Sequence, residues 1–352
     1  MTKVFKILAA FFSLFLFITG MLTFLSGLIE LPSIFILSSL LTPFIILGSA
    51  FMVVFWTIFK SKWLLVNLIT IILHINLIGG TLQWPGGKPS QQETTELTLC
   101  SYNIQSMLYG KTDLTATLIR NFLSNHKVDI VCLQEVDLSN PSAVEALQTL
   151  LAAYPHVALQ DGLEPGFGLV IASKYPVLQH ADIPFGQSNN HSMWADIQLP
   201  SRTLRLFNMH LQSTQYNQIK RRSALDNWVW DSQREYNQTH SFLSKLAFNE
   251  RNRLRQVQTL TEIIQKSPHA SFACGDLNSS PFSFTYRQLE TTLRDGFRSA
   301  GRGYEYTYRY LFNLYRTDYI FHPDSYEPLS YQSFNLPFSD HKPVLIKGRF
   351  TH

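Results

Sequence analysis

The sequence contains little cysteine and little charge. Three cysteines, Cys100, Cys132 and Cys274, occur in 352 residues without any Cys-x-x-Cys spacing, so we expect neither a disulfide framework nor a zinc site. Each cysteine lies in an apolar run, which predicts buried free thiols. With 45% hydrophobic residues, 17 Gly and 16 Pro, the chain is neither disordered nor collagen-like.

Charge is almost missing from the first 80 positions. They hold four lysines and one glutamate. Subtracting these from the totals of 29 basic and 25 acidic residues leaves 25 and 24, a net charge of +1 over the remaining 272 residues. Because tight, non-specific binding of duplex nucleic acid depends on neutralising many phosphates, this balance argues against it.

Two long apolar runs, 7–29 and 34–59, contain no charged residue. At about 1.5 Å per residue, each is long enough to cross the roughly 30 Å hydrocarbon core of a membrane. A third run, 64–80, lies at the lower limit of about 17 residues. It contains His74 and Asn76, which are expected to form hydrogen bonds between helices or to pack near the interface, with a functional polar pair within the membrane as the alternative. We therefore expect a membrane anchor of about three transmembrane helices over 1–80.

The lysines at the ends of the apolar runs predict their orientation. Lys3 and Lys6 precede the first run, Lys60 and Lys62 follow the second, and Glu30 lies between them. This pattern places the N-terminus in the cytoplasm and everything after position 80 on the extracytoplasmic side, the periplasm of a bacterial-type inner membrane. If the third run lies only at the membrane interface and does not cross, the residues after position 80 are instead on the cytoplasmic side. The first run is too long for a signal peptide and lacks an A-x-A cleavage site.

After a linker predicted over 81–96, short β-rich runs alternate with helical patterns over a domain at 97–352. The predicted strands are 97–102, 129–134, 168–173, 203–209, 271–274, 318–321 and 343–346, and the predicted helices are 114–125, 143–153 and 250–266. The alternation indicates an α/β domain. The polar stretch 212–249 is expected to form a solvated helical hairpin, with a phosphate or lipid contact through Trp228 and Trp230 as the alternative.

Polar residues follow or precede most of these apolar runs. They are Asn103, Gln134, Glu135, His210, Asp276, Asn278, Asp340 and His341. Each alone is typical of a turn or a helix cap, but together they indicate a site at strand ends. Carboxylates and amides are the ligands that Mg²⁺ or Mn²⁺ prefers, and phosphoester hydrolysis needs such a metal together with a group that orients water.

Seven short motifs in this chain resemble those of the endonuclease/exonuclease/phosphatase superfamily. They are SYNI at 101–104, LQEV at 133–136, SKYP at 173–176, NMHL at 208–211, GDLNS at 275–279, RTDYIF at 316–321 and SDHKP at 339–343. The resemblance covers about 97–350. It implies a four-layer α/β/β/α sandwich, in which two mixed β-sheets pack face to face with helices outside and a metal site lies at one edge.

The resemblance also implies roles for the metal-binding and water-activating residues. Glu135 would be the principal metal ligand, and Asn103 and Asp340 would complete the metal shell. Asp276 would orient or deprotonate the attacking water, while Asn278 would hold the phosphate or that water.

Two histidines complete the implied catalytic set. Asp318 would hydrogen-bond His341 and thereby set its tautomer and charge, and His341 would contact the phosphoryl group in the transition state. His210 would be a second imidazole for the phosphate or the leaving group. Arg253 and Arg316 are interpreted as surface charges, with a contact to the substrate as the alternative.

These inferences predict a membrane-tethered phosphoester hydrolase that depends on Mg²⁺, with Mn²⁺ as the alternative ion. It would act as a nuclease-like phosphodiesterase through metal-assisted attack of water. The alternatives are a lipid phosphodiesterase of sphingomyelinase type, an inositol-phosphate phosphatase and a catalytically silent module that binds a phosphorylated ligand. The expected partners are the lipid bilayer, through the N-terminal helices, and a nucleic-acid or phospholipid phosphoester; no protein partner is expected.

Overall fold

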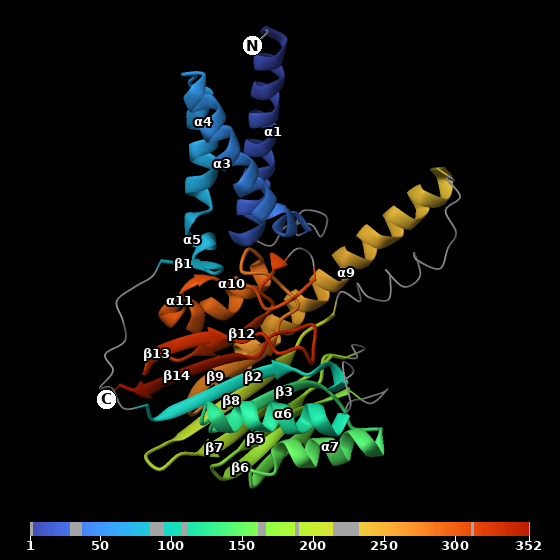
Figure 1. Ribbon diagram of the computed structural model, residues 1–352, viewed down its shortest axis with the longest axis vertical. Coiled ribbons are helices and arrows are strands. Elements are labelled where there is room, and N and C mark those ends of the chain that lie inside the picture. The colour runs from blue at the N-terminus through green and yellow to red at the C-terminus, as the bar shows by residue number, and fades with distance from the viewer. Residues whose placement is uncertain are drawn as a thin grey trace. The chain divides into compact units, whose positions relative to one another are not determined.

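The computed structural model describes residues 3–28, 37–84, 95–107, 112–160, 167–186, 190–213, 232–310 and 313–351 (Figure 1). The chain divides into two compact units. One comprises Met1–Ile78, Ser213–Arg255 and Phe282–Arg287, and the other comprises Gly79–Gln212, Gln256–Pro281 and Gln288–His352.

The first unit begins with apolar helices. They are α1 (Lys3–Leu28), the 3-10 helix η1 (Leu37–Leu41), α3 (Thr42–Ile58), α4 (Trp63–Leu73) and α5 (Ile75–Ile78). Leu16, Met52 and Trp56 form a small buried cluster between α1 and α3. His74 lies 2.8 Å from the Thr23 hydroxyl of α1, which confirms the expected hydrogen bond between helices.

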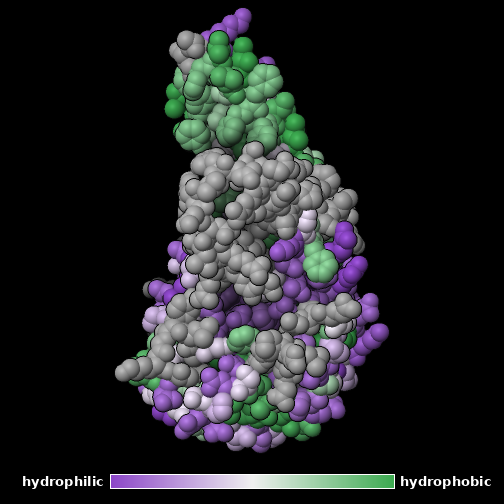
Figure 2. Space-filling model, turned by 90° about the vertical axis from the view of Figure 1, so that its right-hand side faces the viewer, coloured by the Kyte–Doolittle hydropathy of each residue, from purple (hydrophilic) through white to green (hydrophobic). Residues whose placement is uncertain are grey.

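Two of these helices are long and apolar enough to cross a membrane, Lys3–Ser26 and Ser39–Ile58, judged by length and composition. Only 28% and 33% of their most apolar windows are buried, and Figure 2 shows hydrophobic side chains over the surface of this helical region. The third expected span is divided at His74 into α4, of 11 residues, and the short α5.

The second unit contains two six-stranded mixed sheets. The first has the order β13 (Tyr326–Ser333), β14 (Val344–Phe350), β2 (Leu97–Asn103), β3 (Ile130–Asp137), β5 (Phe167–Ser173), β4 (His156–Gln160). Within it β2 and β3 are parallel.

The second sheet has the order β10 (Arg294–Asp295), β12 (Asp318–His322), β9 (Ala270–Asp276), β8 (Thr203–His210), β7 (Ser192–Gln198), β6 (Val177–Ile183). Here β8 and β9 are parallel. Two short strands, β1 (Leu82–Gln83) and β11 (Gly303–Tyr304), pair separately.

Alternation of side chains along the strands builds the layers. Leu99 and Cys132 belong to a core cluster that also contains Leu206 and Phe272 of the second sheet, so the two sheets pack face to face. Cys100 points to the other face of its sheet and belongs to a second core cluster, which includes residues of α6 (Thr112–Asn125) and α7 (Pro141–Leu151). These two helices lie side by side in Figure 1. Because strands alternate in facing, the central strands are buried on both faces.

The four-layer sandwich expected from the resemblance is therefore confirmed, and the three cysteines are buried free thiols as predicted. Every predicted strand has a counterpart, as do the predicted helices 114–125, 143–153 and 250–266. The structure adds strands without a continuous apolar pattern, such as the edge strand β6, whose central residues are exposed. The remaining short helices are η2 (Gln105–Met107), α10 (Phe284–Glu290) and α11 (Gly296–Ala300).

The helix predicted over 250–266 is the last part of α9 (Ser232–Gln265), a 34-residue helix. Residues 232–249 are therefore continuous with it, while 214–231, which contain Trp228 and Trp230, lie outside the described residues. Of the predicted linker, 85–94 also lie outside the described residues, and its start forms β1.

Candidate active site

Strands of both sheets bring the predicted site residues to one end of the sandwich. Asn103 ends β2 and Asp276 ends β9, whereas Asp318 begins β12. Because β12 runs antiparallel to β9, Asp318 and Asp276 are direct partners in the strand pairing. His341 stands just before β14, which runs antiparallel to β2.

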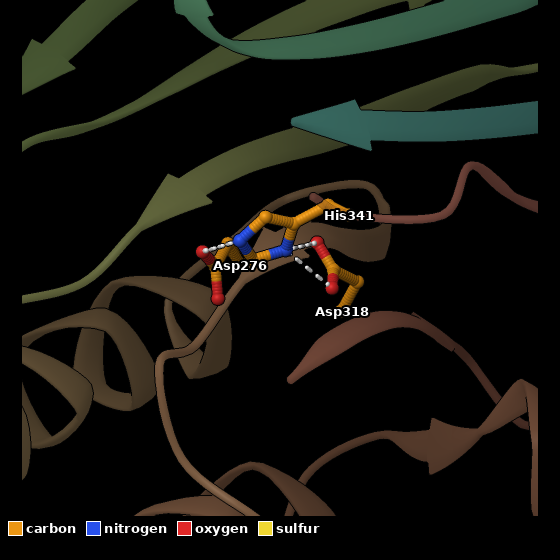
Figure 3. Close-up of side chains that lie close together, drawn as sticks. All are labelled: Asp276, Asp318 and His341. Carbon is orange, nitrogen blue, oxygen red and sulfur yellow. Dashed lines mark hydrogen bonds and ion pairs between the residues drawn. The ribbon is translucent and has the colours of Figure 1, made fainter. Parts of the chain in front are cut away.

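The centre of the site is His341, placed between two buried carboxyl groups (Figure 3). Its Nδ1 lies 2.9 and 3.1 Å from the two oxygens of Asp318, and its Nε2 lies 3.7 Å from Oδ2 of Asp276. One ligand atom from each of these residues lies within 4.8 Å of the other two. Hydrogen bonding to Asp318 fixes the ring so that Nε2 faces Asp276.

Burial and charge shift the pKa values of these groups in a coupled way. Burial lowers the pKa of His341, but the Asp318 and Asp276 carboxylates outweigh it and hold that pKa well above its usual range. For Asp276, burial dominates and raises its pKa to about 7, although the nearby His341 acts in the opposite direction. The pKa of both members of this pair is therefore raised, that of His341 by the neighbouring carboxylates and that of Asp276 by burial.

Amides connect the carboxylates. The Asn103 Nδ2 donates to Glu135 Oε1 at 3.1 Å and to Asp276 Oδ2 at 3.3 Å. Asn278 donates its backbone N–H to Asp276 Oδ1 at 2.8 Å and its side-chain N–H to the Leu211 carbonyl at 3.0 Å. These bonds hold Asp276 from two sides and leave its orientation little freedom.

Glu135 reaches the site because β3 contains a bulge. Gln134 and Glu135 together stand opposite the single residue Leu169 of β5, where the pairing register shifts. Glu135 has a φ of 54°, a left-handed conformation that is costly for a residue with a side chain. Bulges redirect side chains and occur frequently beside active sites, and this one turns the Glu135 carboxylate toward Asn103.

His210 and Asp340 lie at the margins of the same group. The Nε2 of His210 is 3.5 Å from Glu135 Oε1, and burial lowers the pKa of His210. Asp340 Oδ1 is 3.9 Å from His341 Nε2. All eight residues predicted from the sequence thus lie in one connected network, while their individual roles stay predictions.

Sequence reasoning missed residues that orient this network through the backbone. Thr307 Oγ1 accepts hydrogen bonds from the backbone N–H groups of Thr317 and Asp318 at 2.9 and 3.0 Å. Ser339 Oγ donates to the Asn103 carbonyl at 2.7 Å and accepts from the His341 N–H at 3.0 Å. Ser339 is the first residue of the SDHKP motif, but nothing in the sequence marks Thr307 as different from other threonines.

The interpretation of Arg316 and Arg253 as surface charges is wrong. Arg316 is fully buried and forms a two-pronged ion pair with Asp295, with N–O distances of 2.7 and 2.5 Å. Arg253 is 4% exposed and pairs with Glu250. A buried guanidinium needs such a carboxylate partner. Asp295 lies 21 positions from Arg316, whereas Glu250 lies three positions before Arg253 on the same helix.

The donor atoms suit a hard divalent cation. The carboxylates of Asp276 and Asp340 lie beside the His341 imidazole and that of Glu135 lies beside the His210 imidazole, and no cysteine adjoins them in the described network. Oxygen-rich sites of this kind take Mg²⁺ or Mn²⁺. Among the described residues, Asp276, Asp318 and His341 form a group that could hold a metal ion, and Asp318 is at the same time hydrogen-bonded to His341. The metal shell of Glu135, Asn103 and Asp340 that the resemblance implies stays a prediction.

Residues 100–341 match the sequence model of the Endonuclease/Exonuclease/phosphatase family. The match spans more than half of the chain and includes every residue of the network. The chain therefore belongs to this family, whose members are generally hydrolases and typically use divalent metals.

Solved structures share the fold at low identity. The chain is similar to TDP2 of D. rerio complexed with single strand DNA product, with 16% identity, 73% of this chain and 100% of that chain covered, and a TM-score of 0.53. An endonuclease/exonuclease/phosphatase from Bacteroides vulgatus has 17% identity, coverages of 73% and 100%, and a TM-score of 0.53. A third, from Beutenbergia cavernae, has 17% identity, coverages of 73% and 72%, and a TM-score of 0.54. No curated protein sequence matches the chain.

Proposed function

We propose that the protein is a membrane-tethered, divalent-metal-dependent phosphoester hydrolase that acts as a nuclease-like phosphodiesterase. The observation that carries this proposal is the imidazole of His341, held by Asp318 and facing Asp276 beside the Asn103–Glu135 pair. Such an arrangement supplies a proton acceptor, a fixed cationic donor and an oxygen-rich metal shell in one place.

Asp276 is the group that activates water. Its pKa of about 7 matches the value at which a general base is most effective near neutral pH. The two N–H groups of Asn278 and Asn103 hold its carboxylate in place. A water held against this carboxylate would be both oriented by it and deprotonated by it.

The two histidines face the phosphoryl group with different charges. The raised pKa of His341 keeps its imidazole protonated at neutral pH, so it stabilises negative charge that develops on the phosphoryl oxygens. The lowered pKa of His210 keeps that ring neutral, and it acts as a hydrogen-bond donor. A divalent cation held by Glu135, Asn103 and Asp340 would neutralise phosphoryl charge when bound.

A row of tyrosines beside His341 favours nucleic acid as the substrate. The ring of Tyr308 lies 5.2 Å from that of His341, and Tyr310 follows 5.6 Å from Tyr308 with 37% of its surface exposed. Bases stack on such aromatic side chains without sequence preference. The related fold of D. rerio TDP2 was solved with single strand DNA product, and we propose single-stranded nucleic acid for this chain.

The apolar helices favour a second candidate, a lipid phosphodiesterase. A bilayer tether raises the effective concentration of lipid substrates near the site. We also propose that the catalytic domain faces the extracytoplasmic side, as the lysine distribution predicts. A reporter fused after His352 that works only in the cytoplasm should then be inactive, and an active reporter would contradict this orientation.

The decisive experiment uses the full-length protein in detergent with Mg²⁺. Single-stranded oligonucleotide, supercoiled plasmid and mixed micelles of phospholipid and sphingolipid are compared, with the Asp276→Asn variant as the blank. We expect metal-dependent cleavage of the oligonucleotide that EDTA and Asp276→Asn both abolish. Headgroup release alone would favour the lipid enzyme, and no hydrolysis of any of the three would refute the proposed nuclease activity.

A further inference from the structure

A histidine that the sequence reasoning passed over adjoins the site from β7. His191 immediately precedes Ser192, which pairs with Met209 of β8. The backbone N–H of His210 donates to the His191 carbonyl at 3.0 Å. The two histidines are therefore cross-strand neighbours at the end of the antiparallel β7–β8 pair, and directly opposed residues point their side chains to the same face of a sheet.

The pattern along each strand identifies that face. Met193 lies two positions beyond His191, and Leu206 lies four positions before His210; both belong to the core between the two sheets. Since residues separated by even numbers share a face, both imidazoles point into the space between the sheets. His210 lies at the end of this face, where its ring is close to Glu135.

The ring of His191 is buried and incompletely bonded. The residue is 5% exposed, and its Nε2 has no hydrogen-bond partner among the described residues. The Nε2 of His210 also lacks a hydrogen bond there, with Glu135 Oε1 near it at 3.5 Å. Two adjacent imidazoles with unsatisfied nitrogens are unusual, because buried polar atoms in native proteins are nearly always paired.

The chemistry of the surroundings indicates which ligand would satisfy them. Burial lowers the pKa of His191, so at neutral pH the ring is neutral and carries one N–H. An N–H donor requires an acceptor, and the acceptor that reaches this end of the sandwich during hydrolysis is a phosphoryl oxygen. Two neighbouring imidazoles can donate to two oxygens of one phosphoryl group.

We propose that His191 is a further catalytic residue, whose Nε2–H donates a hydrogen bond to a phosphoryl oxygen of the substrate beside His210. The inference rests on the proposed function and extends it by naming a phosphate contact on β7. If His191 only filled space, another ring of similar size could replace it without loss of activity. This expectation distinguishes a packing role from a phosphate contact.

The test therefore compares three replacements in the full-length protein. His191→Phe keeps a ring and removes the donor, His191→Ala removes both, and His191→Gln keeps an N–H donor. His180→Phe is the matched control, because His180 lies on the exposed edge strand β6. Each protein is assayed for kcat/KM on the oligonucleotide and for affinity toward inorganic phosphate, the probe for the phosphoryl group, and its thermal unfolding is recorded.

We expect His191→Phe and His191→Ala to lower kcat/KM by about 10²-fold and phosphate affinity by about 10-fold. His191→Gln should recover most of both losses, and His180→Phe should match the wild type. Wild-type phosphate affinity and kcat/KM in a folded His191→Phe protein would overturn the inference while leaving the proposed function intact.

A measurement on the unaltered protein guards against variants that fail to fold. The nitrogen resonance of His191 Nε2 is followed by NMR as inorganic phosphate is added. A shift that saturates with phosphate binding supports the contact, and an unchanged resonance during demonstrable binding overturns it. A wild-type protein that neither hydrolyses phosphoesters nor binds phosphate would refute the proposed function, and this inference with it.

Discussion

Gly275 shows how a single residue determines where the Asp276 carboxylate lies. Its φ is 137°, and a Cβ at this position would lie 1.9 Å from the Met209 carbonyl oxygen of the parallel strand β8. Both the conformation and the close approach exclude side chains. In the GDLNS motif, the close packing of β8 against β9 therefore requires the glycine, and the proposed chemistry requires the aspartate that follows it.

We predict that Gly275→Ala destabilises the protein by about 3 kcal/mol or more, because the backbone strain adds to a clash with main-chain atoms that cannot move away. Gly186→Ala is the control, since Gly186 has a φ of 63° but nothing within 4 Å of the added Cβ. It should cost only about 1 kcal/mol. Urea unfolding of both variants measures the difference, and equal losses would contradict the role of the clash.

Other residues of the site also have backbone conformations that side chains disfavour. Glu135 and Asn278 have φ values of 54° and 52°. Glu135 accepts a hydrogen bond from Asn103, and Asn278 donates one to Asp276. Residues in such conformations concentrate at functional sites, where the surrounding structure enforces them. One of these two residues, Asn278, bonds directly to Asp276, and the other, Glu135, accepts from the Asn103 amide that also bonds Asp276.

At the scale of elements, the segment between β11 and β12 connects the site to the rest of the second unit. It buries Glu305 and Thr307 and leaves Tyr306 and Tyr308 half-buried. The alternation resembles that of a strand, and Tyr308 forms isolated bridges with Tyr315 and His341. Through Thr307 this segment holds the start of β12, and thereby Asp318.

We predict that Thr307→Val lowers kcat by roughly 10-fold and destabilises the protein by about 2 kcal/mol, because two buried N–H groups lose their acceptor. Thr307→Ser keeps the oxygen and should restore kcat to near the wild-type value. Thr307 is a positioning residue, so KM should change less than kcat. Steady-state kinetics with urea unfolding test this, and a failed rescue by Ser would argue against the hydrogen bonds as the cause.

The buried pair of Arg316 and Asp295 joins three elements. Asp295 caps α11 by accepting from the Phe297 N–H at 3.0 Å, and Arg316 also donates to the Gly80 carbonyl at 2.7 Å. Both side chains are fully buried. Loss of one charge would leave the other buried and unpaired, which is far more costly than loss of an exposed pair.

We predict that Asp295→Asn destabilises the protein by about 3–5 kcal/mol, since it leaves the Arg316 charge without a carboxylate. The control is Asp324→Asn, whose partner Arg294 is 64% exposed and which is itself 78% exposed. Stability should be unchanged in this variant because solvent screens the pair. Thermal or urea unfolding compares them, and similar losses in both would refute the importance of burial.

At the scale of the whole molecule, apolar surface distinguishes the N-terminal helices. Phe11, Phe51 and Ile58 are each more than 60% exposed, although α1 and α3 pack against each other. Large apolar side chains in such numbers on the outside of helices indicate contact with a hydrophobic environment. A bilayer is the environment that the length of the two helices fits.

From the proposed membrane tether we predict that the full-length protein remains in the membrane fraction after an alkaline carbonate wash and is released only by detergent, because two apolar helices of spanning length would anchor it. A variant without residues 1–60, detected in the same fractions, is the control for adsorption of the remaining chain. Release of the full-length protein by carbonate would show that the helices do not span.

The sequence by itself determined the family, the order of most strands and the identity of the residues in the network. Apolar periodicity is local information, and a central strand buried on both faces reads as a continuous apolar run. Motifs such as GDLNS and SDHKP carry their residues at fixed short spacings. These features therefore needed no knowledge of how distant segments pack.

Only the tertiary structure decided which of these residues meet, and how. Asn103 bonds to Asp276 across 173 positions of sequence, and His191 reaches His210 through strand pairing. The bulge at Glu135, the acceptor role of Thr307 and the burial of Arg316 likewise arise from register and packing. In the folded core, the partners of a residue come from strands that are distant in sequence. These contacts therefore depend on the free energy of the whole assembled core, and the local sequence does not specify them.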